Sequence, residues 1–139
     1  IRVEITEETV MPPVLCSETE IEQVFLNIFR NAAQAISGAP EPIENPRISV
    51  SMSTGDGWAR IRIEDNGPGM PPEVQRRIFE PFFTTKKPGE GTGIGLSVSY
   101  FIITRGHGGK IHADANPEGG MRFTIELPLK EPSAAEEPA

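Results

Sequence analysis

Apolar residues recur at helical spacing through the first third of the chain. Ser17, with Glu20 three residues later, has the pattern of a capping box, in which the two side chains satisfy backbone N–H groups at the start of a helix. Gly38 marks the end of the pattern. The residues of the apolar stripe between these signals are Ile21, Val24, Phe25, Ile28, Ala32, Ala35 and Ile36. Their spacing predicts a helix with this stripe facing the core.

Farther along, apolar and polar residues alternate, as in half-buried strands. Residues 48–53 and 58–64 alternate on either side of Gly55-Asp56-Gly57, which predicts a hairpin with one dry face. Residues 110–115 and 121–129 predict a closing antiparallel pair in the same way.

Three shorter elements complete the expected set. Residues 2–5 predict a short strand, and residues 71–78 a short helix with proline in its first turn. Residues 94–104 predict a longer helix that begins at a glycine-rich loop. Helices therefore interrupt the strands along the chain.

Composition narrows the function classes. The length of 139 residues suits one domain, and a net charge of −7 with a pI near 4.9 excludes nucleic acid as a partner, since a phosphate backbone demands a basic face. No apolar stretch approaches the roughly 18 residues that span a bilayer, so we expect no direct membrane contact by this domain. A lone cysteine, Cys16, excludes an internal disulfide and suits a cytoplasmic location.

We expect one folded domain over residues 1–130 and a disordered tail over residues 131–139. The tail is mostly proline, alanine and glutamate, which cannot bury enough apolar area to offset the entropy of ordering it. Because the chain opens on Ile1 and a strand-like run, we expect it to be part of a longer protein, with any membrane anchor upstream.

The predicted first helix carries Asn27 and Asn31 one turn apart, away from the apolar stripe. Asparagine is a poor helix former, and its amide oxygen is a hard neutral ligand that suits Mg²⁺. Taken alone, the pair is more typical of a solvated polar face.

A second candidate follows the predicted hairpin directly. It is the run Asp65-Asn66-Gly67-Pro68-Gly69-Met70. Its glycines permit close approach of a ligand to the backbone, and the Asp65 carboxylate can accept a hydrogen bond from an exocyclic amine such as that of adenine. Standing alone, the run is also good turn chemistry.

Two more runs complete the pattern. The first, Phe79-Glu80-Pro81-Phe82-Phe83-Thr84-Thr85-Lys86, bunches aromatic residues before hydroxyls and a lysine, as suits a hinge beside phosphates or a plain hydrophobic corner. The second, Gly91-Thr92-Gly93-Ile94-Gly95-Leu96, opens a helix whose free N–H groups favour an anion. Four independent parts in this order suit one magnesium nucleotide.

At these residues the chain resembles the nucleotide-binding superfamily of gyrase, the ninety-kilodalton heat-shock chaperones, mismatch-repair ATPases and histidine kinases. Residues 23–32 look like the kinase N box, 65–70 like its first glycine box, 79–83 like its F box and 91–96 like its second glycine box. The last two runs are especially similar to the nitrogen-regulator branch of sensor kinases. The resemblance implies an α/β (α+β) fold, a two-layer sandwich with a mixed, mostly antiparallel sheet covered on one face by helices.

The resemblance also implies roles for individual residues. Asn31 would hold Mg²⁺, Asp65 would read the adenine amine, residues 91–96 would wrap the phosphates and residues 84–90 would form a mobile lid. The full candidate set for ATP is Asn27, Asn31, Asp65, Gly67, Gly69, Met70, Phe83, Thr84, Thr85, Lys86, Gly91, Thr92, Gly93, Ile94, Gly95 and Leu96. Asn27 and Lys86 are the candidate catalytic residues.

Asn27 decides between reaction classes. The ATPase branches carry a glutamate general base there, and an amide cannot take a proton from water. The sequence therefore favours a protein-histidine kinase of a two-component system, with Lys86 and Mg²⁺ neutralising charge during phosphoryl transfer. The alternatives are an ATP-driven conformational ATPase and a pseudokinase that binds nucleotide only to signal.

The expected partners follow from the same resemblance. They are a histidine-bearing dimerisation domain of the same parent, through which the parent would form a homodimer, and a response regulator receiver domain downstream. His107 and His112 are the only histidines here, and a capping or surface role suits them better than phosphoacceptance. The chain departs from the family at Met121, where many members have threonine near adenine, and at Gln34, where some have lysine.

Overall fold

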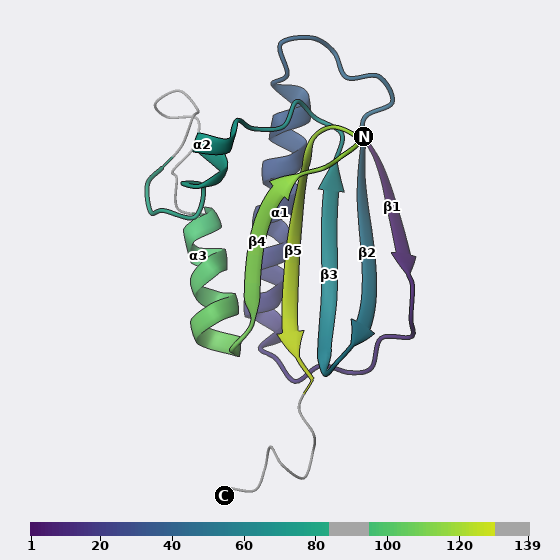
Figure 1. Ribbon diagram of the computed structural model, residues 1–139, viewed down its shortest axis with the longest axis vertical. Helices are drawn as coiled ribbons and strands as arrows, with labels where there is room; N and C mark the ends of the chain where they lie inside the picture. The colour runs from purple at the N-terminus through teal and green to yellow at the C-terminus, as the bar shows by residue number, and fades with distance from the viewer. Residues whose placement is uncertain (84–94, 130–139) are drawn as a thin grey trace, which may run out of the picture.

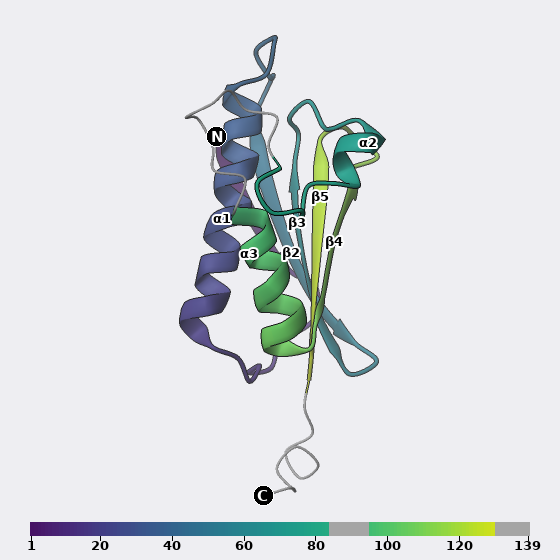
Figure 2. The ribbon, with the colours of Figure 1, turned by 90° about the vertical axis from the view of Figure 1, so that its left-hand side faces the viewer.

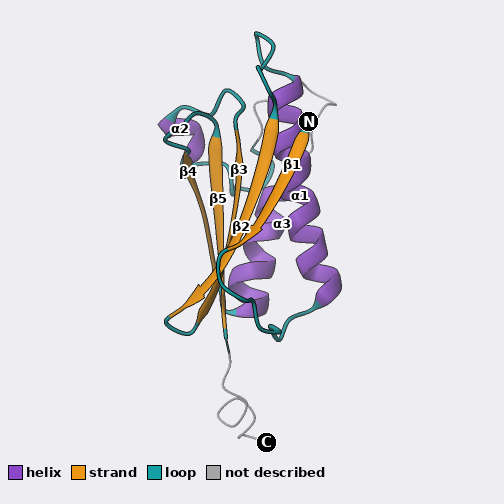
Figure 3. Ribbon diagram, turned by 90° about the vertical axis from the view of Figure 1, so that its right-hand side faces the viewer, coloured by secondary structure: helices purple, strands orange, loops and turns teal. Residues whose placement is uncertain are grey.

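The computed structural model describes residues 1–83 and 95–129 and has two layers. A five-stranded sheet forms one layer, and the helices α1 and α3 lie side by side against one of its faces (Figures 2 and 3). This is the predicted fold class. Among the described residues, no helix is long and apolar enough to cross a membrane.

The sheet contains every strand that the alternation predicted. Its strands are β1 (Arg2–Glu7), β2 (Arg47–Gly55), β3 (Trp58–Asp65), β4 (Lys110–Ala115) and β5 (Met121–Pro128). They lie in the order β1-β2-β3-β5-β4, with β1 parallel to β2 and the other pairs antiparallel (Figure 1). The last residues of β3 and the first residues of β5 therefore lie side by side at one end of the sheet, where a site can form.

The hairpin between β2 and β3 shows why the sequence fixes the register. Gly55 pairs with Trp58, and the two residues between them, Asp56 and Gly57, have φ angles of 52° and 80°. A two-residue turn with positive φ at both positions matches the twist of the strands. The apolar residues of β3 consequently face the helices, with Ile63 only 2% exposed.

Helix α1 (Glu18–Ser37) begins where the capping box predicted, since the Ser17 hydroxyl accepts a hydrogen bond from the Glu20 N–H. Most of the predicted stripe is buried, but Phe25 and Ala35 are only partly so. Asn27 is 8% exposed and belongs to the buried surface of α1. This burial is not explained by the apolar pattern.

The two later helices differ from their predicted extents. Helix α2 spans only Pro72–Gln75, because the N–H groups of Arg77 and Glu80 bond to carbonyls three residues back, which tightens the chain into turns. Helix α3 (Gly95–Phe101) continues into a π-helical turn, η1 (Ile102–Gly106). Periodicity does not predict a π turn.

His107 closes the end of this helical segment. Its Nδ1 lies 2.9 Å from the Ile102 carbonyl oxygen, and its Nε2 accepts a hydrogen bond of 3.0 Å from the Ser17 N–H. Because a backbone N–H can only donate, Nε2 carries no proton and Nδ1 donates to the carbonyl. The expected capping role of His107 is thus what the structure shows, and the ring ties the start of α1 to the end of η1.

Candidate functional site

Asp65 lies at the end of β3 and is 4% exposed. Its Oδ1 accepts hydrogen bonds from the Gly67 N–H at 2.9 Å and the Met121 N–H at 3.3 Å. No described residue donates to Oδ2. One carboxylate oxygen is therefore fixed by backbone, while the other is left for a donor from a ligand.

Burial raises the pKa of the Asp65 carboxyl, and the hydrogen bonds from the Gly67 and Met121 N–H groups partly oppose the rise. The charged form of the carboxyl therefore costs more free energy here than in water. A ligand amine that donates to Oδ2 would offset part of this cost.

Gly120 explains how Asp65 reaches this position. Its φ is 90°, and a Cβ at Gly120 would overlap the carbonyl carbon and oxygen of Asp65. Only glycine allows the chain before β5 to approach β3 so closely. Sequence reasoning missed both Gly120 and the Met121 N–H; the signal available was the Gly119-Gly120 pair directly before a strand.

The two predicted glycines of the first box have different neighbours. A Cβ at Gly67 would come within 3.1 Å of Asp65 Oδ1 and 3.4 Å of Ile36 Cγ1, whereas Gly69 has a φ of 79° and a Cβ there would lie 3.4 Å from the Gly120 carbonyl oxygen. Met70 is held by its carbonyl, which accepts from Gln75 Nε2 at 2.8 Å. The box therefore packs beside the last turn of α1.

The two asparagines of α1 have different surroundings. Asn27 Nδ2 donates to the Gly95 carbonyl at 2.9 Å and to Ser99 Oγ at 3.1 Å, and its Oδ1 accepts from Gln23 Nε2 at 3.1 Å. The solvated-face interpretation is therefore wrong for Asn27. Asn31, one turn on, is half-buried and has no hydrogen bond to the side chain from any described residue.

The aromatic run packs only in part, and its polar end, Thr84 to Lys86, lies outside the described residues, so the hinge interpretation stays a prediction. Phe79 packs on the domain, with ring centroids 5.5 Å from Tyr100 and 6.3 Å from Phe123. Phe83 lies under the Arg77 guanidinium at 4.5 Å. Phe82 is 73% exposed and has a φ of 65°, an unusual backbone conformation for an aromatic residue.

The remaining candidates are only partly described. Thr84, Thr85, Lys86, Gly91, Thr92, Gly93 and Ile94 lie outside the described residues. Gly95 and Leu96 open α3, where the Gly95 carbonyl meets Asn27 and Leu96 packs against the core.

Helix α1 sets the distance between the two ends of the site. Gly67 lies beside Ile36, and Gly95 lies beside Asn27, nine residues earlier on the same helix. At 1.5 Å per residue these points are about 13.5 Å apart along the axis of α1, with Asn31 between them in the chain. The site is thus elongated, with a carboxylate at one end, a glycine-box residue at the other and an amide between them.

The site fits the chemistry of a magnesium nucleotide. Asp65 Oδ2 offers an acceptor, glycines remove side chains from the approach to it, and Asn31 offers an amide oxygen without a described partner. Within the described residues, no three His, Cys, Asp or Glu side chains gather as a metal site. Mg²⁺ usually keeps waters and shares phosphate oxygens, so an amide such as that of Asn31 would be one ligand among several.

Residues 16–131 match a family described as histidine kinase-, DNA gyrase B- and HSP90-like ATPase. The chain is 42% identical over 117 residues to the two-component sensor PprA of Pseudomonas aeruginosa, covering 84% of this chain and 12% of that protein. It is 38% identical over 129 residues to the sensory histidine kinase/phosphatase NtrB of Vibrio alginolyticus, covering 86% and 35%. The chain spans well under half the length of these relatives.

Solved structures give the same result. The catalytic domain of histidine kinase ThkA superimposes with a TM-score of 0.77 at 33% identity, over 91% of this chain and 78% of that one. ThkA in complex with the response regulator protein TrrA gives a TM-score of 0.70 at 32% identity, over 92% and 34%. Full-length ShkA in complex with AMPPNP gives 0.72 at 26% identity, over 91% and 25%.

Proposed function

The chain belongs to the histidine kinase-, DNA gyrase B- and HSP90-like ATPase family, as a catalytic domain of the sensor histidine kinase type, and we propose that it transfers the γ-phosphate of ATP to a histidine on a separate dimerisation domain. The observation that carries the proposal is the half-paired Asp65 carboxylate, which accepts from the Gly67 and Met121 N–H groups through Oδ1 only.

Asp65 would read the base. Its free Oδ2 accepts from an exocyclic amine, which adenine presents and which guanine replaces by a carbonyl at the same position. Gly67 and Gly69 would let the base lie against the backbone. Burial makes the choice strict, because an unpaired buried acceptor facing a carbonyl costs about 1–3 kcal/mol.

Asn31 would hold the metal. Its amide is uncommitted among the described residues and lies between the two ends of the site. Bound Mg²⁺ would neutralise phosphate charge, which is most of what phosphoryl transfer requires. The roles of Lys86 and of residues 91–96 at the same phosphates stay predictions.

Hydrolysis is disfavoured by the state of Asn27. Both of its N–H donors and its oxygen are occupied by Gly95, Ser99 and Gln23, and an amide cannot accept a proton from water. This argues against the ATP-driven conformational ATPase. The pseudokinase alternative differs only in lacking transfer, so a transfer measurement separates it.

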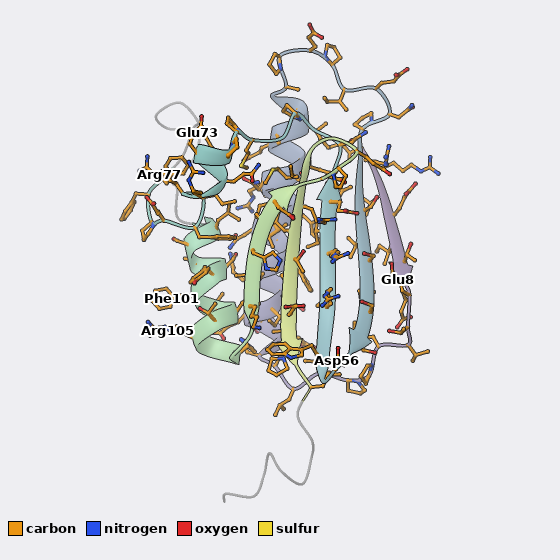
Figure 4. The ribbon with its side chains drawn as sticks, in the orientation of Figure 1. Glu8, Asp56, Glu73, Arg77, Phe101 and Arg105 are labelled. Carbon is orange, nitrogen blue, oxygen red and sulfur yellow. The ribbon has the colours of Figure 1, made fainter. Side chains whose placement is uncertain are left out.

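The acceptor would come from outside the chain. His107 uses both ring nitrogens in the fold, and His112 lies on the sheet face away from the helices. On the outer side of α3, Phe101 is 60% exposed and carries the Arg105 guanidinium 5.7 Å from its ring centroid (Figure 4). Phe101 and Arg105 belong to the helical segment that begins at Gly95, so we propose that the dimerisation domain docks on this side of α3. A response regulator would act downstream, and the assembly would lie in the cytoplasm.

The test is phosphotransfer between separate polypeptides. This chain is mixed with a histidine-bearing dimerisation domain and ATP labelled on the γ-phosphate, and labelled histidine is measured by intact mass. We expect labelled phosphate on the dimerisation domain and no label on this chain. Without the dimerisation domain, we expect ATP to be hydrolysed only slowly. Brisk hydrolysis without an acceptor, or phosphate on His107 or His112, would overturn the proposal.

A further inference from the structure

Ser99 is a fully buried hydroxyl at the contact of α1 and α3. It is 0% exposed, its Oγ donates to the Gly95 carbonyl at 3.0 Å and accepts from Asn27 Nδ2 at 3.1 Å. Small apolar side chains usually fill such a position, since a buried hydroxyl costs free energy unless it is paired. Here the Ser99 hydroxyl both donates, to Gly95, and accepts, from Asn27.

Asn27 completes a closed set of hydrogen bonds with Ser99. One Nδ2 hydrogen reaches the Gly95 carbonyl and the other reaches Ser99 Oγ, while Ser99 in turn donates to the same carbonyl. Gln23 fixes the Asn27 amide from the other side. Two side chains from different helices therefore converge on one backbone atom, the carbonyl oxygen of Gly95.

The glycine itself leaves room for this arrangement. A Cβ at Gly95 would lie 3.5 Å from Asn27 Cγ, an ordinary contact, so the protein does not need glycine there for packing. The position of Gly95 is instead constrained by the hydrogen bonds that Asn27 and Ser99 donate to its carbonyl. These bonds fix where α3 begins.

We propose that Asn27 and Ser99 are positioning residues, which hold the Gly95 carbonyl and thereby fix the start of α3, at Gly95 and Leu96, for the phosphates of ATP. The inference rests on the proposed function and refines it: Asn27 acts through Gly95 and does not touch metal or phosphate, whereas Asn31 acts through the metal. Ser99, which no motif identified, is part of the same device.

Ser99→Ala tests the proposal against a matched control in the same helical segment. Thr104 Oγ1 also donates to the carbonyl four residues back, that of Tyr100, at 2.7 Å, but Thr104 is only partly buried and makes no hydrogen bond to a described residue of α1. Thr104→Ala therefore removes the same type of intrahelical bond without the tie to Asn27. Affinities for ATP and for adenosine are measured by calorimetry with Mg²⁺ and with a chelator, and melting confirms that each variant folds.

We expect Ser99→Ala to weaken ATP binding by about five- to tenfold, as loss of a buried hydrogen bond implies, and to leave adenosine binding unchanged. The loss should persist in the chelator, since it does not pass through the metal. Thr104→Ala should change neither affinity. Equal effects of the two variants, equal losses for ATP and adenosine, or a loss seen only with Mg²⁺ would each overturn the proposal.

Asn27→Asp gives a second, independent arm. A carboxylate is a better Mg²⁺ ligand than an amide, but it cannot donate to the Gly95 carbonyl. A positioning role predicts weaker ATP binding, and a direct metal role predicts unchanged or tighter binding in Mg²⁺. If the unaltered chain bound no ATP at all, the proposed function would fail first, and this inference with it.

Discussion

Backbone groups hold one end of the site in place, and side chains hold the other. At the proposed base end, Asp65 is held by backbone N–H groups and by the close approach of Gly120, so the geometry depends on the sheet. At the proposed phosphate end, Gly95 is held by two side chains, Asn27 and Ser99. A backbone-built end cannot change without moving strands, whereas a side-chain-built end can be altered one bond at a time. Base recognition should therefore be rigid and phosphate binding tunable.

Gly120→Ala should have the largest effect on stability, because it disturbs the contact between backbone segments that holds Asp65 in place. The new Cβ would overlap the Asp65 carbonyl, so β3 and β5 must move apart, at a cost of about 3 kcal/mol or more. Thermal melting should show a fall of roughly 10 °C. Gly119→Ala is the control, since φ is also positive there but no atom lies within 4 Å of the new Cβ. Equal losses from both variants would mean that backbone strain, and not contact with Asp65, is responsible.

Asp65→Asn should separate binding from stability at the same end. The amide oxygen can still accept from the Gly67 and Met121 N–H groups, so the fold is kept, but its NH₂ group would face the adenine amine. We expect ATP affinity to fall by about tenfold or more with no loss of melting temperature. A large drop in melting temperature would instead mark Asp65 as structural.

The pH dependence of the same variant has a defined sign. Because burial raises the folded-state pKa of Asp65 above its ordinary value of 3.8, its favourable contribution to stability is present below that value and lost as the pH rises through the folded pKa. Asn does not titrate. The stability of Asp65→Asn relative to the unaltered chain should therefore increase with pH above 3.8 and then level off. A difference that stays constant over this range, measured by denaturant titration, would contradict the cause given for the shift.

Asn31→Ala should have a smaller effect, limited to the affinity for ATP in the presence of Mg²⁺. We expect weaker ATP binding in Mg²⁺, by about tenfold or less, with no change in the chelator or in stability, since no described residue depends on its side chain. Asn27→Ala, by contrast, should also lower the melting temperature, because it removes hydrogen bonds to Gly95 and Ser99. Similar behaviour of the two variants would erase the distinction between the asparagines.

Gly95→Ala should have the smallest effect on the fold. Its Cβ would make only ordinary contacts with Asn27, so stability should change by no more than about 0.5 kcal/mol. Any loss of ATP binding would then come from crowding of the ligand itself. A marked loss of stability would show that Gly95 is needed for packing.

Local patterns predicted most of the fold, because each depends on neighbouring residues. The capping box placed the start of α1 at Ser17, and Asp56-Gly57 fixed the hairpin register. The resemblance to histidine kinases was confirmed by the family match and the solved structures. The assignments of individual site residues stay predictions, as does the boundary near residue 130, and the expected tail lies outside the described residues.

What the sequence did not reveal depends on contacts between distant segments. The Gly120 approach joins residues 55 positions apart, and the Asn27–Ser99 bond joins residues 72 positions apart. A polar residue on a helix gives no local sign of whether it is solvated or paired, so Asn27 and Asn31 looked alike. The π turn after Phe101 likewise has no periodic signature.

We infer that the half-paired, buried Asp65 carboxylate reads the base of a nucleotide. The most direct measurement is calorimetric titration of the chain with Mg·ATP and, under the same conditions, with Mg·GTP. We expect ATP to bind at least about tenfold more tightly than GTP, because only adenine offers a donor to Asp65 Oδ2. Equal affinities for the two nucleotides would contradict it.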